Sequence, residues 1–211
     1  MPIIAVCNQK GGTGKTCTAV HLAHWLKTRK RKQVILIDAD PQQSAYVWLQ
    51  GIEKSSVRAI GDVNELLEQV PELAKSTEFV VIDSPPQLAE TARAILFCCD
   101  LAVIPMQPTG LDLHSTNDAF RLVRQAKTLR NGNPIAAVFL SRAIKGTRLK
   151  NESMSILSQI PDISLLKTVV HQKQAIADAF GQRATIWEMK DGESSAKEYQ
   201  SLFKEVLELA K

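Results

Sequence analysis

The sequence lacks the features that mark membrane-spanning, secreted and metal-cluster proteins. No apolar run approaches the roughly 20 residues that a membrane-spanning helix requires, and the N-terminus has neither the basic head nor the apolar stretch of a signal peptide. The four cysteines form no C-x-x-C pair, and the adjacent Cys98 and Cys99 point in different directions, which makes them poor joint ligands for one metal ion. We therefore expect a cytoplasmic protein whose thiols are buried and reduced.

Nor does any linker, low-complexity stretch or internal repeat divide the chain. Its 211 residues suffice for one domain with a self-supporting core, and 45% apolar with 23% charged residues is an ordinary globular balance. We expect a single domain over residues 1–211. The net charge of +4 is compatible with an acidic partner such as nucleic acid, but many housekeeping proteins share it.

Short apolar runs alternate with longer helical patterns along the chain. Continuous apolar runs predict strands that are covered on both faces, and a repeated strand–helix–strand order predicts parallel pairing. The expected fold class is therefore α/β, with a mostly parallel central sheet and helices on both faces. We expect strands at residues 3–7, 34–37, 79–82, 101–104 and 135–140, helices at 15–27, 63–70, 88–97, 113–129 and 194–211, a further helix from about 174, and a loop over 51–61.

A glycine-rich segment, K-G-G-T-G-K-T from Lys10 to Thr16, directly follows the first expected strand and opens the first expected helix. Glycines let the backbone wrap around phosphate oxygens with its N–H groups pointing inward, and the start of a helix favours anions. Lys15 brings a compact positive charge to the β- and γ-phosphates, and the Thr16 hydroxyl can ligate Mg²⁺. We predict a site for ATP with Mg²⁺, lined by Gly11, Gly12, Thr13, Gly14, Lys15, Thr16 and Cys17.

Aspartates stand at the ends of two further expected strands. Asp38 and Asp40 follow residues 34–37, and Asp83 follows residues 79–82. Because parallel strands end at the edge of the sheet where ligands bind, these carboxylates can hold Mg²⁺ or orient the attacking water. Thr16, Asp38 and Asp83 are the expected metal ligands.

The glycine-rich segment departs from the common G-x-x-x-x-G-K-[ST] pattern, since Gln9 replaces the first glycine and Lys10 precedes the paired glycines. In this it resembles the deviant Walker A box of the ParA/MinD family of P-loop ATPases. The runs D-A-D-P-Q from Asp38 and D-S-P-P from Asp83 resemble that family's first switch and its Walker B region. The resemblance is specific over the first 113 residues and loose thereafter, and it implies a P-loop NTPase fold.

Roles for individual residues follow from this resemblance. Lys10 would reach across an ATP-bound homodimer to the neighbour's nucleotide, and Lys15 would hold the phosphates of its own. Asp38 would lie nearest the hydrolytic water, with Asp40 supporting it. Hydrolysis should be slow, because no arginine finger is evident in the motifs and a lysine spreads charge less well over a phosphoryl group.

The resemblance also implies partners. In ParA-like proteins the dimer binds nucleoid DNA without reading its sequence, and a cargo-linked ParB-like or adaptor protein stimulates hydrolysis. The cargo could be a plasmid, a chromosome or a protein compartment. Such DNA binding needs only clustered positive charge. The candidate residues are Arg142, Lys145, Arg148, Lys150, Lys167, Lys173 and Arg183.

Three alternatives stay open. A MinD-like protein would dock on a membrane through its last helix, but three lysines there face three glutamates, and we expect its apolar stripe (Tyr199, Leu202, Phe203, Val206) to pack on the sheet. An iron-protein-like redox function would need a cysteine such as Cys98 to bind a cluster. A metabolic P-loop enzyme would need a small-molecule substrate.

The sequence also departs from the family pattern in its later half. Ser141 and Lys173 stand where the family often has asparagine and arginine. No helix-turn-helix fits before residue 10.

Overall fold

The computed structural model describes residues 1–52, 56–87 and 89–211, without the side chains of 111–115. A central sheet of parallel strands organises this part of the chain. All of its strand pairs are parallel, and their order is β3-β2-β4-β1-β5-β6-β7. The order places β1, which precedes the glycine-rich loop, at the middle of the sheet. The strands are β1 (Ile3–Val6), β2 (Val34–Asp38), β3 (Val57–Ala59), β4 (Phe79–Asp83), β5 (Leu101–Met106), β6 (Ile135–Leu140) and β7 (Ser164–Leu165).

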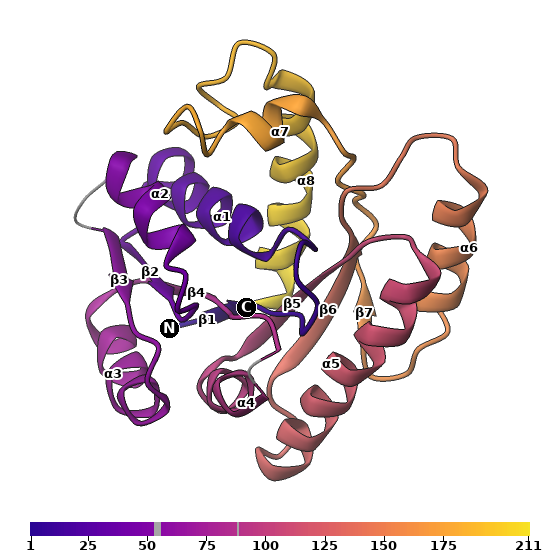
Figure 1. Cartoon of the computed structure of the whole chain (residues 1–211). Helices are drawn as coiled ribbons and strands as arrows, with labels where there is room; N and C mark the ends of the chain where they lie inside the picture. Colours follow the sequence, from indigo (N-terminus) through magenta and orange to yellow (C-terminus); the bar gives the residue numbers. More distant parts are fainter. Residues whose placement is uncertain (53–55, 88) are drawn as a thin grey trace.

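Helices cover both faces of this sheet (Figure 1). One apolar core joins the sheet to α3, α4, α5 and α6, and a second joins it to α1, α2 and α8. The helices are α1 (Lys15–Lys30), α2 (Ser44–Ile52), α3 (Val63–Ser76), α4 (Ala89–Cys98), α5 (Gly110–Leu129), α6 (Arg148–Leu157), α7 (Gln174–Asp178) and α8 (Glu193–Leu209).

Strand β1 shows why a continuous apolar run is needed in such a sheet. Ile3 and Ala5 belong to one core, whereas Ile4 and Val6 belong to the other. Because successive side chains of a strand point to opposite faces, a strand between two helical layers must be apolar at every position. The predicted α/β class, the parallel sheet and the five predicted strands are confirmed.

Several predicted bounds differ from the structure by two or three residues, and two predictions were wrong by more. The helix expected to end near Pro71 continues to Ser76, because Leu73 and Ala74 prolong the apolar face that begins with Leu66 and packs on the core. The segment 51–61, expected to be a loop, contains the edge strand β3. β3 was missed because only Val57 among its three residues is buried, which leaves no apolar run to recognise. Residues 53–55 of that segment, and the expected helix start at residue 88, lie outside the described residues.

The last helix packs as predicted. Tyr199, Leu202, Phe203 and Val206 of α8 are buried in the core that also contains Trp25 of α1. The stripe is therefore occupied within the molecule. In the described part of the chain, no helix is both long and apolar enough to cross a membrane.

Candidate nucleotide-binding site

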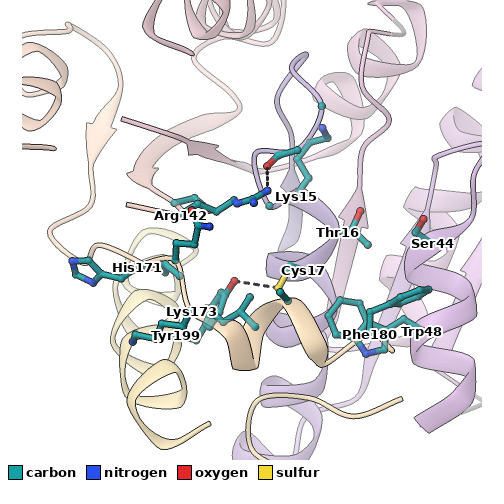
Figure 2. A pocket seen from close by; sticks show the side chains of 18 of the residues that line it. Lys15, Thr16, Cys17, Ser44, Trp48, Arg142, His171, Lys173, Phe180 and Tyr199 are labelled. Carbon is teal, nitrogen blue, oxygen red and sulfur yellow. Dashed lines mark hydrogen bonds between the residues drawn. The ribbon is translucent and has the colours of Figure 1, made fainter. Parts of the chain in front are cut away.

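A cavity of about 680 Å³ opens at the carboxyl edge of the sheet. Open α/β sheets bind their ligands at this edge. The cavity lies between the loop before α1, the start of α2, the segment after β6, and α7 with the residues before it (Figure 2). Its lining includes Gly11, Gly12, Gly14, Lys15, Thr16, Cys17, Asp40, Ser141, Arg142 and Lys173, so it gathers most of the residues predicted from the motifs.

The glycine-rich loop forms one wall of the cavity. Gly12 and Gly14 have φ of 76° and 93°, a left-handed conformation that other residues rarely adopt. At Gly14 a side chain would also collide with its surroundings, since a Cβ there would lie 2.8 Å from the Ser141 Oγ. Helix α1 begins directly afterwards at Lys15, so its N-terminus, where backbone N–H groups favour an anion, borders the cavity.

Lys15 is buried within this loop. Its Nζ donates a 2.9 Å hydrogen bond to the Lys10 carbonyl, so the loop closes around its own lysine. Burial lowers the pKa of Lys15, and the nearby Asp83 carboxylate acts in the opposite direction. A buried cation beside a helix N-terminus is an arrangement suited to an anionic ligand such as a phosphate.

Asp83 is a buried carboxyl group without a hydrogen-bond partner in the described part of the chain. It is fully buried at the end of β4, and neither of its oxygens has a hydrogen-bond partner among the described residues. Burial raises the pKa of Asp83 to about 8, and the Lys15 charge and the nearby Thr16 hydroxyl act in the opposite direction, although the hydroxyl does not reach normal hydrogen-bond geometry. An unpaired buried carboxylate is costly, and a cation would satisfy it.

The donors around Asp83 fit Mg²⁺. Thr16 borders the cavity, and its hydroxyl favours the ionised form of Asp83, so hydroxyl and carboxylate oxygens stand together. No group of three or more His, Cys, Asp or Glu side chains able to hold a metal occurs within residues 1–52, 56–87 and 89–211. This sparse set suits Mg²⁺, which usually takes one or two protein oxygens and completes its shell with water and substrate phosphates.

Asp38 lies beside Asp83 but is already engaged. The two aspartates are register partners on the neighbouring strands β2 and β4. Asp38 accepts hydrogen bonds from the Asp40 N–H at 3.0 Å and from the Tyr46 N–H, in the first turn of α2, at 2.8 Å. Asp38 therefore ties the end of β2 to the first turn of α2. Asp40 is half-buried, borders the cavity and accepts a 3.0 Å bond from the Gln42 N–H.

Lys10 is held near the cavity by a residue that the motif does not include. The Asn8 side chain accepts a 3.1 Å bond from the Lys10 N–H and donates a 2.8 Å bond to the Pro105 carbonyl at the end of β5. Asn8 is buried, so this link fixes where the loop leaves the sheet. Only its place between β1 and the motif could have drawn attention to it in the sequence.

Two of the seven predicted DNA-binding residues border the cavity. The Arg142 guanidinium donates a 2.9 Å bond to the Gly12 carbonyl (Figure 2). Lys173 forms a 2.7 Å ion pair with Glu198 of α8, which also pairs with His171 at 2.9 Å. Of the others, Arg148 is exposed and paired with Glu152 at 2.6 Å. Lys145, Lys167 and Arg183 are exposed, and Lys150 is half-buried.

Cys17 and Thr13 complete the predicted phosphate loop, whereas the cysteines of the redox alternative lie elsewhere. Cys17 borders the cavity, where its Sγ lies 3.4 Å from the Tyr199 hydroxyl (Figure 2). Thr13 is buried within the loop. Cys98 and Cys99 are buried at the end of α4, next to the start of β5 and hence at the opposite edge of the sheet. They do not lie where a cluster bound beside the cavity would need them.

The strand order, the glycine-rich loop and the buried lysine and aspartate together define a P-loop nucleotide-binding protein. A family model described as the CobQ/CobB/MinD/ParA nucleotide binding domain matches residues 4–186. The chain belongs to this family, as the motifs predicted.

Individual relatives and structures agree with this assignment. The chain is 41% identical over 114 residues, 53% of its length, to the maintenance of carboxysome distribution protein A of Gloeobacter kilaueensis, and this match spans only 51% of that relative. It is 26% identical over 212 residues to the protein of the same name from Halothiobacillus neapolitanus, covering 97% of this chain and 95% of the relative. The solved structure of apo McdA from Cyanothece superposes with a TM-score of 0.81 at 18% sequence identity, covering 98% of this chain and 99% of that one. The ATP complex of a McdA variant from Cyanothece superposes with a TM-score of 0.79 at 17% sequence identity, covering 100% of this chain and 98% of that one. These structures show the shared fold.

Proposed function

We propose that this chain is an ATP-dependent positioning ATPase, which dimerises around Mg-ATP, binds nucleoid DNA without reading its sequence, and moves or distributes a cargo. The observation that carries the proposal is the meeting of the Lys10–Thr16 loop with the unpaired, buried carboxylate of Asp83 at the carboxyl edge of the sheet. The names of the relatives favour a positioning function over the metabolic alternative.

In this proposal each residue at the edge has one task. Lys15 and the loop N–H groups hold the phosphates, and Thr16 with Asp83 holds Mg²⁺, which neutralises phosphate charge when bound. Asp38 orients the attacking water, and its two bonds to backbone N–H groups keep the carboxylate in place. Asp38 also links the position of the attacking water to α2, so we propose that a change around the phosphates is passed on to this helix.

Lys10 gives the proposal its dependence on two copies. Lys10 precedes the paired glycines of the loop, and we propose from the resemblance to the deviant Walker A box that it meets the neighbour's triphosphate. In such an arrangement ATP binding and dimerisation favour each other, because Lys10 of one copy contacts the ATP that the other copy binds. Hydrolysis then separates the two copies.

DNA and the cargo-linked partner are proposed to bind on the surface of the dimer. We propose that the exposed basic residues around α6 and β7, together with Arg183, meet DNA phosphates, and that the protein works in the cytoplasm on the nucleoid. Arg142 and Lys173 are the weaker members of the predicted set because both line the cavity and each has a partner within the molecule. A cargo-bound adaptor or ParB-like protein would stimulate hydrolysis and release.

An ATP-dependent DNA-binding assay over a salt series tests this proposal. We expect tight binding only with Mg-ATP, weakening steeply with salt. Lys10→Ala should abolish the bound state, and Asp38→Ala should trap it. Asp62 is the matched control, because it also caps a helix, accepting bonds from the Asn64 and Glu65 N–H groups, but lies away from the cavity. Asp62→Ala should behave as the parent does. DNA binding that persists without nucleotide would refute the switch.

A further inference from the structure

One carbonyl of the phosphate loop is held by two side chains from distant parts of the chain. The Gln107 Nε2 donates a 2.7 Å hydrogen bond to the Gly12 carbonyl, and the Arg142 guanidinium donates a 2.9 Å bond to the same oxygen. Gln107 follows the end of β5, and Arg142 lies two residues beyond β6. Neither belongs to a nucleotide-binding motif.

The geometry of the peptide bond gives this double contact a consequence. In a trans peptide the carbonyl of one residue and the N–H of the next point in opposite directions. Two donors that hold the Gly12 carbonyl therefore direct the Thr13 N–H to the opposite side of that peptide bond. Thr13 is fully buried, and its N–H makes no backbone hydrogen bond within the described residues.

Gly12 is also a place where the loop backbone can change its conformation easily. Its φ of 76° is a conformation that glycine exchanges readily with others. Rotation of the Gly12–Thr13 peptide would turn the N–H away and present a carbonyl oxygen to the phosphates. A repulsive oxygen in place of a donor is unfavourable for an anion.

We propose that Gln107 and Arg142 form a clamp on the Gly12 carbonyl that presets the Thr13 N–H for phosphate binding. They are positioning residues and act on the nucleotide through the loop. The proposal rests on the proposed nucleotide-binding function and adds to it two residues that stand outside the motifs. It also gives Arg142 a task other than contact with DNA.

The clamp predicts an effect on affinity without an effect on folding. Arg142 and Gly12 are exposed and Gln107 is half-buried, and surface changes of this kind leave stability nearly unchanged. The test is the dissociation constant of Mg-ADP carrying a fluorescent label, measured for the parent, Gln107→Leu, Arg142→Ala and the double variant. We expect about a threefold weakening for each single variant and more than about tenfold for the double variant, with thermal unfolding of the nucleotide-free protein unchanged.

Matched controls separate the clamp from general effects of charge and side-chain loss. Gln125→Leu and Arg121→Ala remove the same side-chain types from the exposed surface of α5, away from the cavity, and should bind within about twofold of the parent. Arg142→Lys keeps a donor and should recover part of the affinity.

The binding measurements distinguish failure of the clamp from failure of the proposed nucleotide-binding function. If the double variant binds Mg-ADP as tightly as the parent, the clamp is wrong while nucleotide binding stands. If Gln107→Leu has no effect and Arg142→Ala accounts for the whole loss, Arg142 acts on the phosphates itself and the shared clamp is again wrong. If the parent binds no better than Lys15→Ala, the proposed function itself fails.

Discussion

Replacing Asp83 by asparagine should make the nucleotide-free protein more stable while removing its use of Mg²⁺. Burial raises the pKa of Asp83 from an ordinary 3.8 to about 8, so at neutral pH the group is protonated in the folded state and ionised in the unfolded state. The unfolded state therefore binds fewer protons, and the folded state loses stability as the pH rises from about 4 to about 8.

The size of the effect follows from the same values. At pH 7 a pKa difference of this extent corresponds to about 4 kcal/mol of lost unfolding free energy. An asparagine removes that cost, but its amide has no partner at the site and costs about 1–3 kcal/mol in return. We therefore expect Asp83→Asn to gain about 1–3 kcal/mol at pH 7 to 8 and much less near pH 5.

Urea unfolding of the parent and Asp83→Asn from pH 5 to pH 8, without metal or nucleotide, measures this gain. ATP hydrolysis with Mg²⁺ should be lost in the same variant, since the proposed carboxylate ligand is gone. A variant that is less stable than the parent at pH 8, or a difference that does not grow with pH, would refute the assignment of Asp83 as a buried carboxylate awaiting a cation.

Three further predictions concern other parts of the fold. Lys15→Ala should weaken Mg-ADP binding about 100-fold, or by about 3 kcal/mol, because the buried ammonium of the loop is lost, and fluorescence titration checks this. Burial lowers the pKa of His21 to about 4, so its contribution is present above its unfolded pKa of 6.5 and should fall by about 2 kcal/mol between pH 6.5 and pH 5; this loss should be absent in urea unfolding of His21→Phe, and an equal loss in that variant would be against it. Gly192→Ala should cost about 3 kcal/mol or prevent folding, because the new Cβ would lie 1.9 Å from the Ile186 carbonyl oxygen; calorimetry that finds no change in melting temperature would contradict the packing of this loop.

The sequence predicted the elements whose signal is local. Strand β1 is apolar at every position because both faces are covered, and the glycine-rich loop must contain glycine wherever φ is positive. Strand β3 has one buried residue among three, and α2 was missed although Ala45, Trp48 and Leu49 have helical spacing. Short elements at the sheet margin bury too little to leave a clear pattern.

The residues of the site also differ in whether the sequence contains a local signal for them. Lys15, Thr16 and Asp83 belong to motifs, and the structure brings them together at one edge. Gln107 and Arg142 reach Gly12 across 95 and 130 residues of sequence, and only the strand order β1-β5-β6 makes them neighbours. Contacts of this kind depend on topology, so residue spacing could not reveal them. The resemblance to ParA-like proteins placed Arg142 among the candidate DNA contacts, which stays a prediction, and only the structure shows its bond to Gly12.

The mass of the protein in solution with Mg²⁺ and a non-hydrolysable ATP analogue tests the central claim most directly. The account predicts a dimer for the parent, and a monomer for Lys10→Ala and for the parent with ADP. A parent that stays monomeric with the ATP analogue, at concentrations where the analogue is bound, would contradict it.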